Sequence, residues 1–195
     1  MLNRIKNMLT HPGMSAVNLY ARADRAGLYR HYARRCRAAG IKKLYLVVSL
    51  DCDLTRDTDC AAAVCERLRG LGVTPVMAVP GELLEQGAAV YRAIHAAGSE
   101  FMNHGHRMHT CRDEPSGAYR SCFFYDALTP EQVREDIRRG HETVRAVLGQ
   151  PPCGFRAPHF GTFQTRAQLR SLHRILKELD YAYSSSTMPY FGLTK

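Results

Sequence analysis

Short apolar segments and amphipathic helical segments alternate along most of this chain. Strands are predicted at residues 43–50, 73–80, 100–103, 153–158 and 181–186, and helices at 57–72, 82–97, 129–149 and 165–179. Strands that alternate with helices in this way form parallel sheets, because each helix returns the chain to the start of the next strand. The alternation therefore predicts an α/β fold with a mainly parallel sheet or barrel. Residues 110–128 are polar, aromatic and irregular, and are predicted to be a loop.

The clearest helix signal surrounds residues 129–149. Thr129 is a good N-cap, Pro130 suits the first turn, and Gln132 completes a capping box. The apolar residues of this segment fall on one helical face, namely Val133, Ile137, Val144 and Leu148. Gly149 and the proline that follows end the helix.

Basic residues are concentrated at the N-terminus. The first 43 residues hold ten Lys or Arg and one acid, Asp24, so they carry the whole net charge of +9 and the remainder is neutral. Residues 16–39 are predicted to form a helix that Gly40 ends. We expect residues 1–43 to be a basic helical extension of the domain at 44–195. It is either a solvated appendage, which we favour, or a contact surface for an anionic partner such as nucleic acid, membrane or acidic polymer.

Composition argues against several classes of protein. No run of about 18 apolar residues is present, so no membrane span is expected. The N-terminus lacks the continuous apolar segment of a secretory signal, and we therefore expect a cytoplasmic protein. The seven cysteines form no C-x-x-C pair, which favours free thiols over a structural zinc cluster.

Reactive polar residues follow three of the predicted strands. Asp51 and Asp53 come after the first strand, "NHGHRMHT" (103–110) after the third, and "RAPHFG" (156–161) at the fourth. In parallel α/β folds the catalytic groups collect at the C-terminal ends of the strands. Two histidines and one aspartate can bind a divalent metal and leave positions open for water and substrate. A second aspartate, away from the metal, could act as a base.

Three motifs in order carry a resemblance to a known family. "SLDCD" (49–53), "GSEFMNHG" (98–105) and "FRAPHFG" (155–161) resemble the successive motifs of the polysaccharide deacetylase superfamily, over about residues 44–190. The D-x-D form of the first motif resembles the branch with peptidoglycan-deacetylase-like and allantoinase-like members. The resemblance implies a deformed (β/α) barrel of the polysaccharide deacetylase type. It also implies metal-assisted hydrolysis of an N-acyl or related amide bond.

The same resemblance implies a role for individual residues. Asp51 would be the general base, and Arg156 would hold its carboxylate in place. Asp53 and His104 would be metal ligands. The backbone N–H near His159 would stabilise the oxyanion.

The chain departs from the family pattern at three places. The second histidine ligand is expected at position 108, which is Met108, so His109 and His106 are the candidates, and we prefer His109. "RAPHFG" has one residue more between proline and glycine than the common R-P-P-Y-G. The late motif with a catalytic histidine is not found, so we expect the barrel to be C-terminally incomplete, with its last strands missing.

The resulting prediction is a divalent-metal hydrolase, with Zn²⁺ as the expected ion. Its leading function is N-deacetylation of a carbohydrate or peptidoglycan, with an N-acylated sugar as substrate. One alternative is a hydrolase of a small ureide or cyclic amide on the same fold. The other is a catalytically impaired binding protein whose basic arm docks on an anionic surface.

Overall fold

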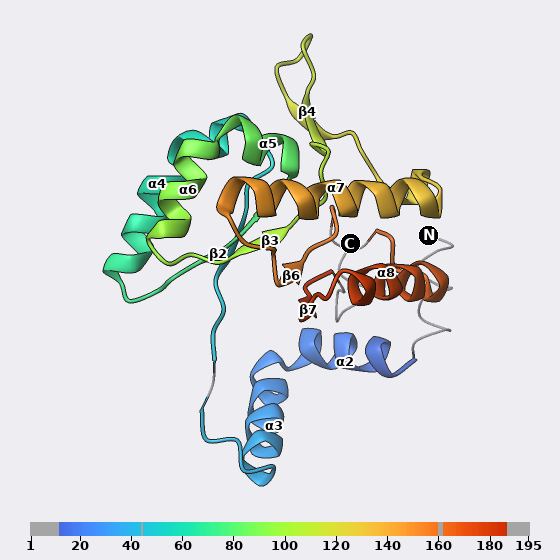
Figure 1. The fold of residues 1–195 in the computed structure, drawn as a ribbon. Helices are drawn as coiled ribbons and strands as arrows, with labels where there is room; N and C mark the ends of the chain where they lie inside the picture. Colours follow the sequence, from blue (N-terminus) through green and yellow to red (C-terminus); the bar gives the residue numbers. More distant parts are fainter. Residues whose placement is uncertain (1–11, 44, 160–161, 187–195) are drawn as a thin grey trace. The chain divides into compact units, whose positions relative to one another are not determined.

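The computed structural model describes residues 12–43, 45–159 and 162–186. The chain divides into two compact units, one of residues 1–46 with 188–195 and one of residues 47–187. Figure 1 shows the elements of both. None of the described helices is long and apolar enough to cross a membrane.

The described residues of the first unit form two helices where the sequence predicted one. Helix α2 (Pro12–Ala23) and helix α3 (Arg25–Ala38) are separated by Asp24. The Asp24 carboxylate accepts the N–H of Gly27 at 2.7 Å and caps α3. The prediction of one continuous helix over 16–39 is therefore wrong, because the only acid of this segment starts a new helix.

Among the described residues of the second unit, five parallel strands form one sheet, in spatial order β1-β2-β3-β6-β7. Each strand pairs with the next of the series in parallel orientation. Their bounds are β1 (Ser49–Asp51), β2 (Val76–Val79), β3 (Phe101–Asn103), β6 (Gly154–Phe155) and β7 (Tyr183–Ser184). This arrangement confirms the predicted α/β fold with a parallel sheet.

Helices connect these strands and contact one another in a continuous layer. Helix α4 contacts α6, both α5 and α6 contact α7, and α7 contacts β3 and α8. Their bounds are α4 (Thr55–Gly70), α5 (Gly81–Gln86), α6 (Ala88–Ala96), α7 (Pro130–Leu148) and α8 (Arg166–Glu178). The segment 82–97, predicted as one helix, is broken between α5 and α6 at Gly87. A Cβ there would lie 2.8 Å from the ring of Tyr91, so this close approach needs glycine.

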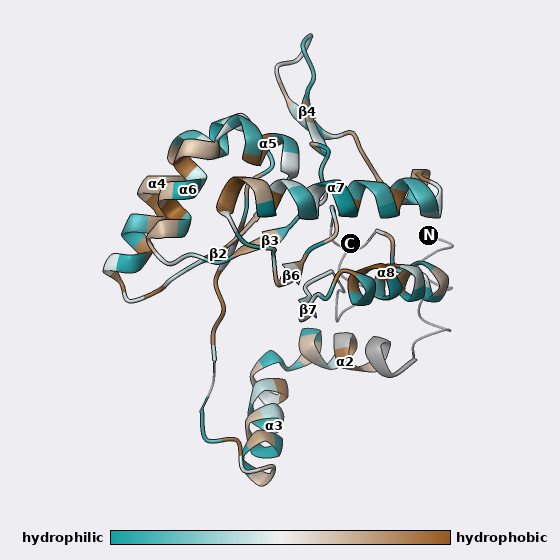
Figure 2. Ribbon diagram, in the orientation of Figure 1, coloured by the Kyte–Doolittle hydropathy of each residue, from teal (hydrophilic) through white to brown (hydrophobic). Residues whose placement is uncertain are grey.

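Helix α7 forms as its sequence predicted. Thr129 Oγ1 accepts the N–H of Gln132, and Gln132 Oε1 accepts the N–H of Thr129 at 2.9 Å. Gly149 ends the helix in the left-handed conformation, with φ 79°. Val133 and Ile137 are buried, whereas the side of α7 that faces the viewer in Figure 2 is largely hydrophilic. The buried face stabilises the helix by apolar contact with the sheet layer.

The first strand is much shorter than predicted. The prediction of a strand over 43–50 is wrong for residues 45–48, which are irregular, and residue 44 lies outside the described residues. β2 begins only at Val76, opposite Ser49, so β2 offers no partner to the residues before Val48. The side chains of Tyr45, Leu46 and Val47 are 73–84% exposed. Apolar composition indicated a buried strand here, but a strand also requires a paired neighbour.

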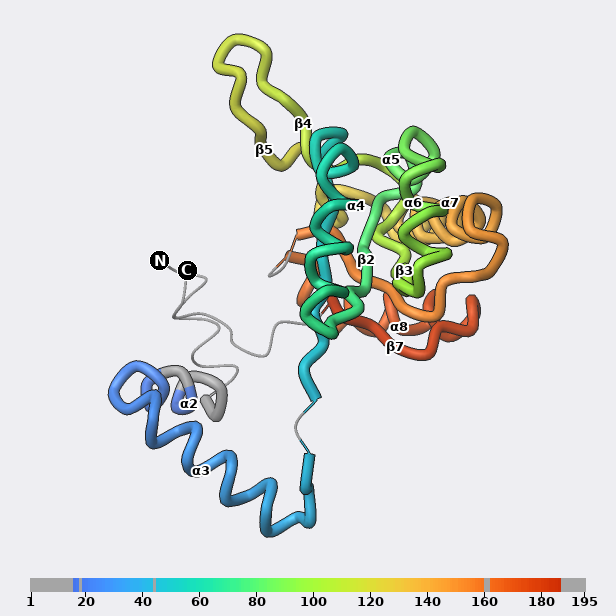
Figure 3. Tube along the Cα trace, turned by 90° about the vertical axis from the view of Figure 1, so that its left-hand side faces the viewer, coloured from blue at the N-terminus to red at the C-terminus, as the bar shows by residue number. Residues whose placement is uncertain are grey.

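Residues 110–128 are more regular than the predicted loop. They form an antiparallel hairpin of β4 (Thr110–Arg112) and β5 (Tyr119–Ser121), followed by the 3₁₀-helix η1 (Tyr125–Ala127). The hairpin projects away from the sheet in two perpendicular views (Figures 1 and 3). Gly117, with φ 66°, lies in the turn between β4 and β5. Each of these strands has only three residues, which is too few for a periodic pattern to show in the sequence.

Candidate active site

Three potential metal ligands meet where the strands of the sheet end. Asp53 follows β1, His104 follows β3, and His109 precedes β4. One ligand atom from each lies within 4.8 Å of the others. Asp53 Oδ1 is 2.9 Å from His109 Nε2 and 3.5 Å from His104 Nε2. The structure thus brings together the three side chains that the sequence predicted as ligands.

Asp53 is fixed by the helix that follows it. Asp57, in the first turn of α4, accepts the backbone N–H groups of Asp53 at 2.8 Å and Leu54 at 2.9 Å. Burial by itself would raise the pKa of the Asp53 carboxyl, but hydrogen bonds and positive charge from His104 and His109 outweigh burial and hold this pKa well below its usual range. The carboxylate is therefore ionised at neutral pH, as a metal ligand must be. Nothing in the sequence indicated this role for Asp57, because the contact depends on how the chain turns between β1 and α4.

His104 is oriented by a backbone carbonyl. Its ring is 2% exposed, and Nδ1 lies 2.7 Å from the carbonyl oxygen of Arg156. A carbonyl oxygen can only accept a hydrogen bond, so Nδ1 carries the proton and donates it. When the ring is neutral, Nε2 is the unprotonated nitrogen, and it is directed toward Asp53 as metal ligation requires.

His109 is the third member of the group. Its ring is 1% exposed and lies 4.5 Å from the ring of His104, centre to centre. Its backbone oxygen accepts the N–H of Cys122 at 3.0 Å, which ties it to the hairpin. Nδ1 is buried and has no hydrogen-bond partner among the described residues. Two imidazole nitrogens and one carboxylate oxygen at this spacing fit a divalent ion such as zinc.

A carboxylate–guanidinium pair lies at the same end of the sheet. Asp51, the last residue of β1, forms an ion pair with Arg156, which follows β6. Arg156 is buried and also donates to Ser49 Oγ and Ser185 Oγ, both at 2.8 Å. Three acceptors fix the planar guanidinium, which in turn fixes the Asp51 carboxylate. Ser49 was not predicted, although it lies two residues before Asp51 and so shares its side of the strand.

His159 lies beside the three-residue group without joining it. Its backbone is left-handed, with φ 58°, and its ring centre is 5.1 Å from that of His109. Its Nε2 donates to the carbonyl oxygen of Phe123 at 3.0 Å, and its Nδ1 lies 3.3 Å from Ser121 Oγ. Burial, followed by the positive charge of His109, lowers the pKa of the His159 imidazole. The neutral ring thus links the loop after β6 to the hairpin.

His106, the other candidate for the second histidine ligand, faces away from Asp53. Its ring is buried against Gly81, and its Nδ1 lies 3.3 Å from Thr143 Oγ1 on α7. Of the two candidates, it is His109 whose side chain reaches Asp53. The structure therefore distinguishes between the two candidate histidines, which their spacing in the sequence could not do.

Solved structures that share this fold include a carbohydrate esterase, a pseudoenzyme and a peptidoglycan deacetylase. A family 4 carbohydrate esterase from Streptomyces lividans matches with TM-score 0.53 and 22% identity, over 71% of this chain and 60% of its own. A family 4 pseudoenzyme from Bacillus anthracis matches with TM-score 0.56 and 14% identity, over 73% and 43%. A peptidoglycan deacetylase from Bacillus subtilis matches with TM-score 0.52 and 13% identity, over 73% and 58%.

The chain thus spans about half the length of these solved relatives, and at these identities the likeness establishes the fold alone. Among curated protein sequences, none matches. The sequence profile described as polysaccharide deacetylase matches residues 45–183. This match covers most of the second unit, including Asp51, Asp53, both candidate histidine ligands and Arg156. The chain therefore belongs to the polysaccharide deacetylase family.

Proposed function

We propose that this protein is a metal-dependent hydrolase that removes N-acetyl groups from a carbohydrate or peptidoglycan. The observation that carries the proposal is the placement of Asp53, His104 and His109 beside the Asp51–Arg156 pair. Amide hydrolysis needs an electrophilic centre and a base, and these two groups supply the ligands for one and the carboxylate of the other. Membership of the deacetylase family supports the same chemistry.

Asp53, His104 and His109 would hold the metal. Zn²⁺ is the expected ion, because two imidazoles and one carboxylate with open positions are typical ligands of catalytic zinc. When bound, such an ion would polarise the acetyl carbonyl and make a water molecule more acidic. The contact between His104 Nδ1 and the Arg156 carbonyl would keep Nε2 unprotonated and directed at the ion.

Asp51 would be the general base. It would accept a proton from the attacking water, while Arg156 keeps its carboxylate in one orientation. The backbone N–H of His159 would stabilise the negative oxygen that develops on the acetyl carbon. The left-handed backbone at His159 and the proximity of its ring to His109 support this assignment.

Metal binding is the first test. Zinc titrated into metal-free protein should bind at one site per chain, and His109→Ala should remove that site. His106→Ala is the matched control, because it removes a neighbouring buried imidazole that faces Thr143, and it should retain zinc. Absence of stoichiometric metal from the wild-type protein would refute the proposed centre. Loss of zinc in His106→Ala but not in His109→Ala would refute the ligand assignment.

Catalysis is tested separately. Acetate release from N-acetylated chitooligosaccharides and from peptidoglycan should be measured for the wild type and for Asp51→Asn. We expect the variant to keep its zinc and lose activity, because Asp51 is proposed to be the general base and not a metal ligand. A wild-type protein that binds zinc and releases no acetate from either polymer would refute the deacetylase proposal while leaving the metal centre intact.

We also propose that the N-terminal extension contacts an anionic surface. The support is a hollow of about 680 Å³ beside α3, where exposed Tyr29 and Tyr32 lie near Arg37, Lys42 and Lys43. Tyrosines among cations suit an anionic interface. Binding to vesicles with phosphatidylserine should fall with added salt and be lost on deletion of residues 1–40. Equal binding of the truncated protein would refute this role.

A further inference from the structure

The loop between the two candidate histidine ligands is held by side chains at every peptide N–H. This loop, residues 105–108, has four N–H groups, and each is accepted by a side-chain oxygen. Asn103 Oδ1 accepts from Gly105 at 2.9 Å. The other three N–H groups are accepted by two carboxylates, Asp136 and Glu82. The loop therefore has a fixed path even though it contains no helix or strand.

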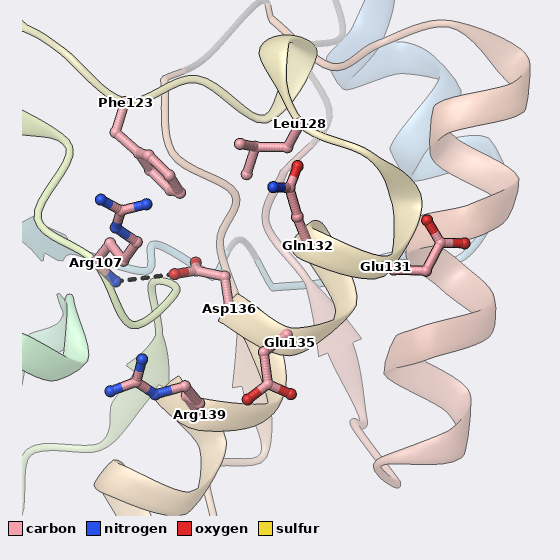
Figure 4. A pocket seen from close by; sticks show the side chains of 8 residues that line it. All are labelled: Arg107, Phe123, Leu128, Glu131, Gln132, Glu135, Asp136 and Arg139. Carbon is pink, nitrogen blue, oxygen red and sulfur yellow. Dashed lines mark hydrogen bonds between the residues drawn. The ribbon is translucent and has the colours of Figure 1, made fainter.

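Asp136 holds the middle of the loop from α7. Its Oδ2 accepts the N–H of His106 at 3.1 Å, and its Oδ1 accepts the N–H of Arg107 at 3.0 Å. The side chain is only 5% exposed, and Tyr125 also donates to it at 2.7 Å. Figure 4 shows Asp136 directed at the Arg107 backbone, on the inner side of a hollow of about 380 Å³. A buried carboxylate that accepts three donors is well stabilised and geometrically constrained.

Glu82 holds the end of the loop from α5. Its Oε2 accepts the N–H of Met108 at 2.7 Å, directly before His109. The first N–H groups of α5 complete the contact, because Gly81 donates to the carbonyl of Gly105 at 3.0 Å and Glu82 to that of His106 at 2.8 Å. The loop carbonyls thus accept hydrogen bonds from the first N–H groups of α5, which have no acceptor within the helix.

The loop is also one residue longer than the polysaccharide deacetylase motif has between its two histidines, which would place the second histidine at position 108. With a longer loop, His109 would have more conformations available, and most of them would not place Nε2 beside Asp53. We propose that Asp136 and Glu82 are positioning residues that select the loop conformation in which His104 and His109 can bind one metal ion. This inference rests on the metal centre proposed above. It assigns a function to two acids that lie outside the proposed set of metal ligands.

The test compares Asp136→Asn with Glu135→Gln. Asn keeps the size of the side chain but presents an NH₂ group to one of the two loop N–H groups. Glu135 is adjacent on α7 but exposed and paired with Arg138, so its amide variant is the matched control. Zinc affinity is measured by competition with a chelator, and the visible absorption spectrum of the Co²⁺-substituted protein reports ligand geometry. Circular dichroism checks that each variant is folded.

We expect Asp136→Asn to bind zinc about 10–100-fold more weakly and to show an altered Co²⁺ spectrum, because misplaced ligands lose affinity by about this factor. Glu135→Gln should match the wild type in both measurements. Wild-type affinity together with a wild-type spectrum in Asp136→Asn would overturn the inference. If Asp136→Asn does not fold, the same measurements on Glu82→Gln test the inference. Glu82 is half-buried, and its substitution perturbs the hydrogen bond to the Met108 N–H. A wild-type protein that binds no metal would instead refute the proposed centre itself.

Discussion

Replacing Gly140 by alanine should test how closely α7 packs on the metal-ligand loop. A Cβ at this position would lie 2.6 Å from the carbonyl oxygen of Gly105 and 2.7 Å from its carbon, and it would also collide with Asn103 Oδ1. None of these atoms can move freely. Asn103 is buried and donates to the carbonyl of Ile137 and to Tyr181 Oη, both at 2.8 Å.

The expected cost is the sum of two destabilising effects and one stabilising effect. Overpacking against a rigid neighbour costs about 1–3 kcal/mol. We expect a cost at the upper end of this range, because the added Cβ would meet backbone atoms of Gly105. Loss of the hydrogen bond between Asn103 and Gly105 adds about 1 kcal/mol. Alanine gains about 1 kcal/mol in helix propensity over glycine. The net loss is about 2–3 kcal/mol, or a fall in Tm of about 6–9 °C for a domain of this size.

Thermal unfolding followed by circular dichroism measures this loss, with Gly70→Ala as the matched control. Gly70 is the last residue of α4, and a Cβ there would meet nothing within 4 Å. The control should therefore be neutral or slightly stabilising. Gly140→Ala should also weaken zinc binding, since it displaces the residue next to His104. Equal Tm values for the two variants would show that α7 does not pack closely against this loop.

Three further outcomes are expected. Arg156→Lys keeps the charge but loses the guanidinium fork, so acetate release should fall about tenfold with zinc retained; an unchanged rate would remove Arg156 from the mechanism. Burial lowers the pKa of His141 below its usual 6.5, so the unfolded state takes up the proton first as pH falls. The free energy of unfolding should then decrease below about pH 6.5, and His141→Gln should reduce that decrease; identical pH profiles would contradict it. Thr129→Ala removes the capping box and should cost about 1 kcal/mol in urea unfolding, whereas no change would mean that the cap is not needed.

The order of strands and helices could be read from the sequence because each element has a local cause. The capping residues around α7 and the alternation of apolar strands with amphipathic helices depend on neighbours in the chain. Residues 45–48 show where this reasoning fails. Their apolar side chains suit a buried strand, but whether a strand forms depends on a partner far away in sequence, and β2 begins too late to provide one.

The site was predictable to the extent that it depends on strand ends. Asp51 ends β1, Asp53 lies two residues later and His104 follows β3, and the rule that catalytic groups gather at such ends located them. Asp136 could not be found in this way. In the sequence it is one acid among several on an amphipathic helix, and only its position between the buried Val133 and Ile137 hinted that it faces inward.

His109, the proposed ligand that was hardest to assign from the sequence, is also the one that does not closely follow a strand of the sheet. Strands β1 and β3 are separated by β2, so these two strands lie about 10 Å apart. The side chains of Asp53 and His104, which follow them, must therefore converge to share an ion. Their backbones are nevertheless fixed by the sheet. His109 does not directly follow a strand of that sheet, and the loop before it is hydrogen-bonded to Glu82 of α5 and Asp136 of α7. A metal centre built in this way should lose its third ligand first when helix packing is disturbed, while the sheet remains folded.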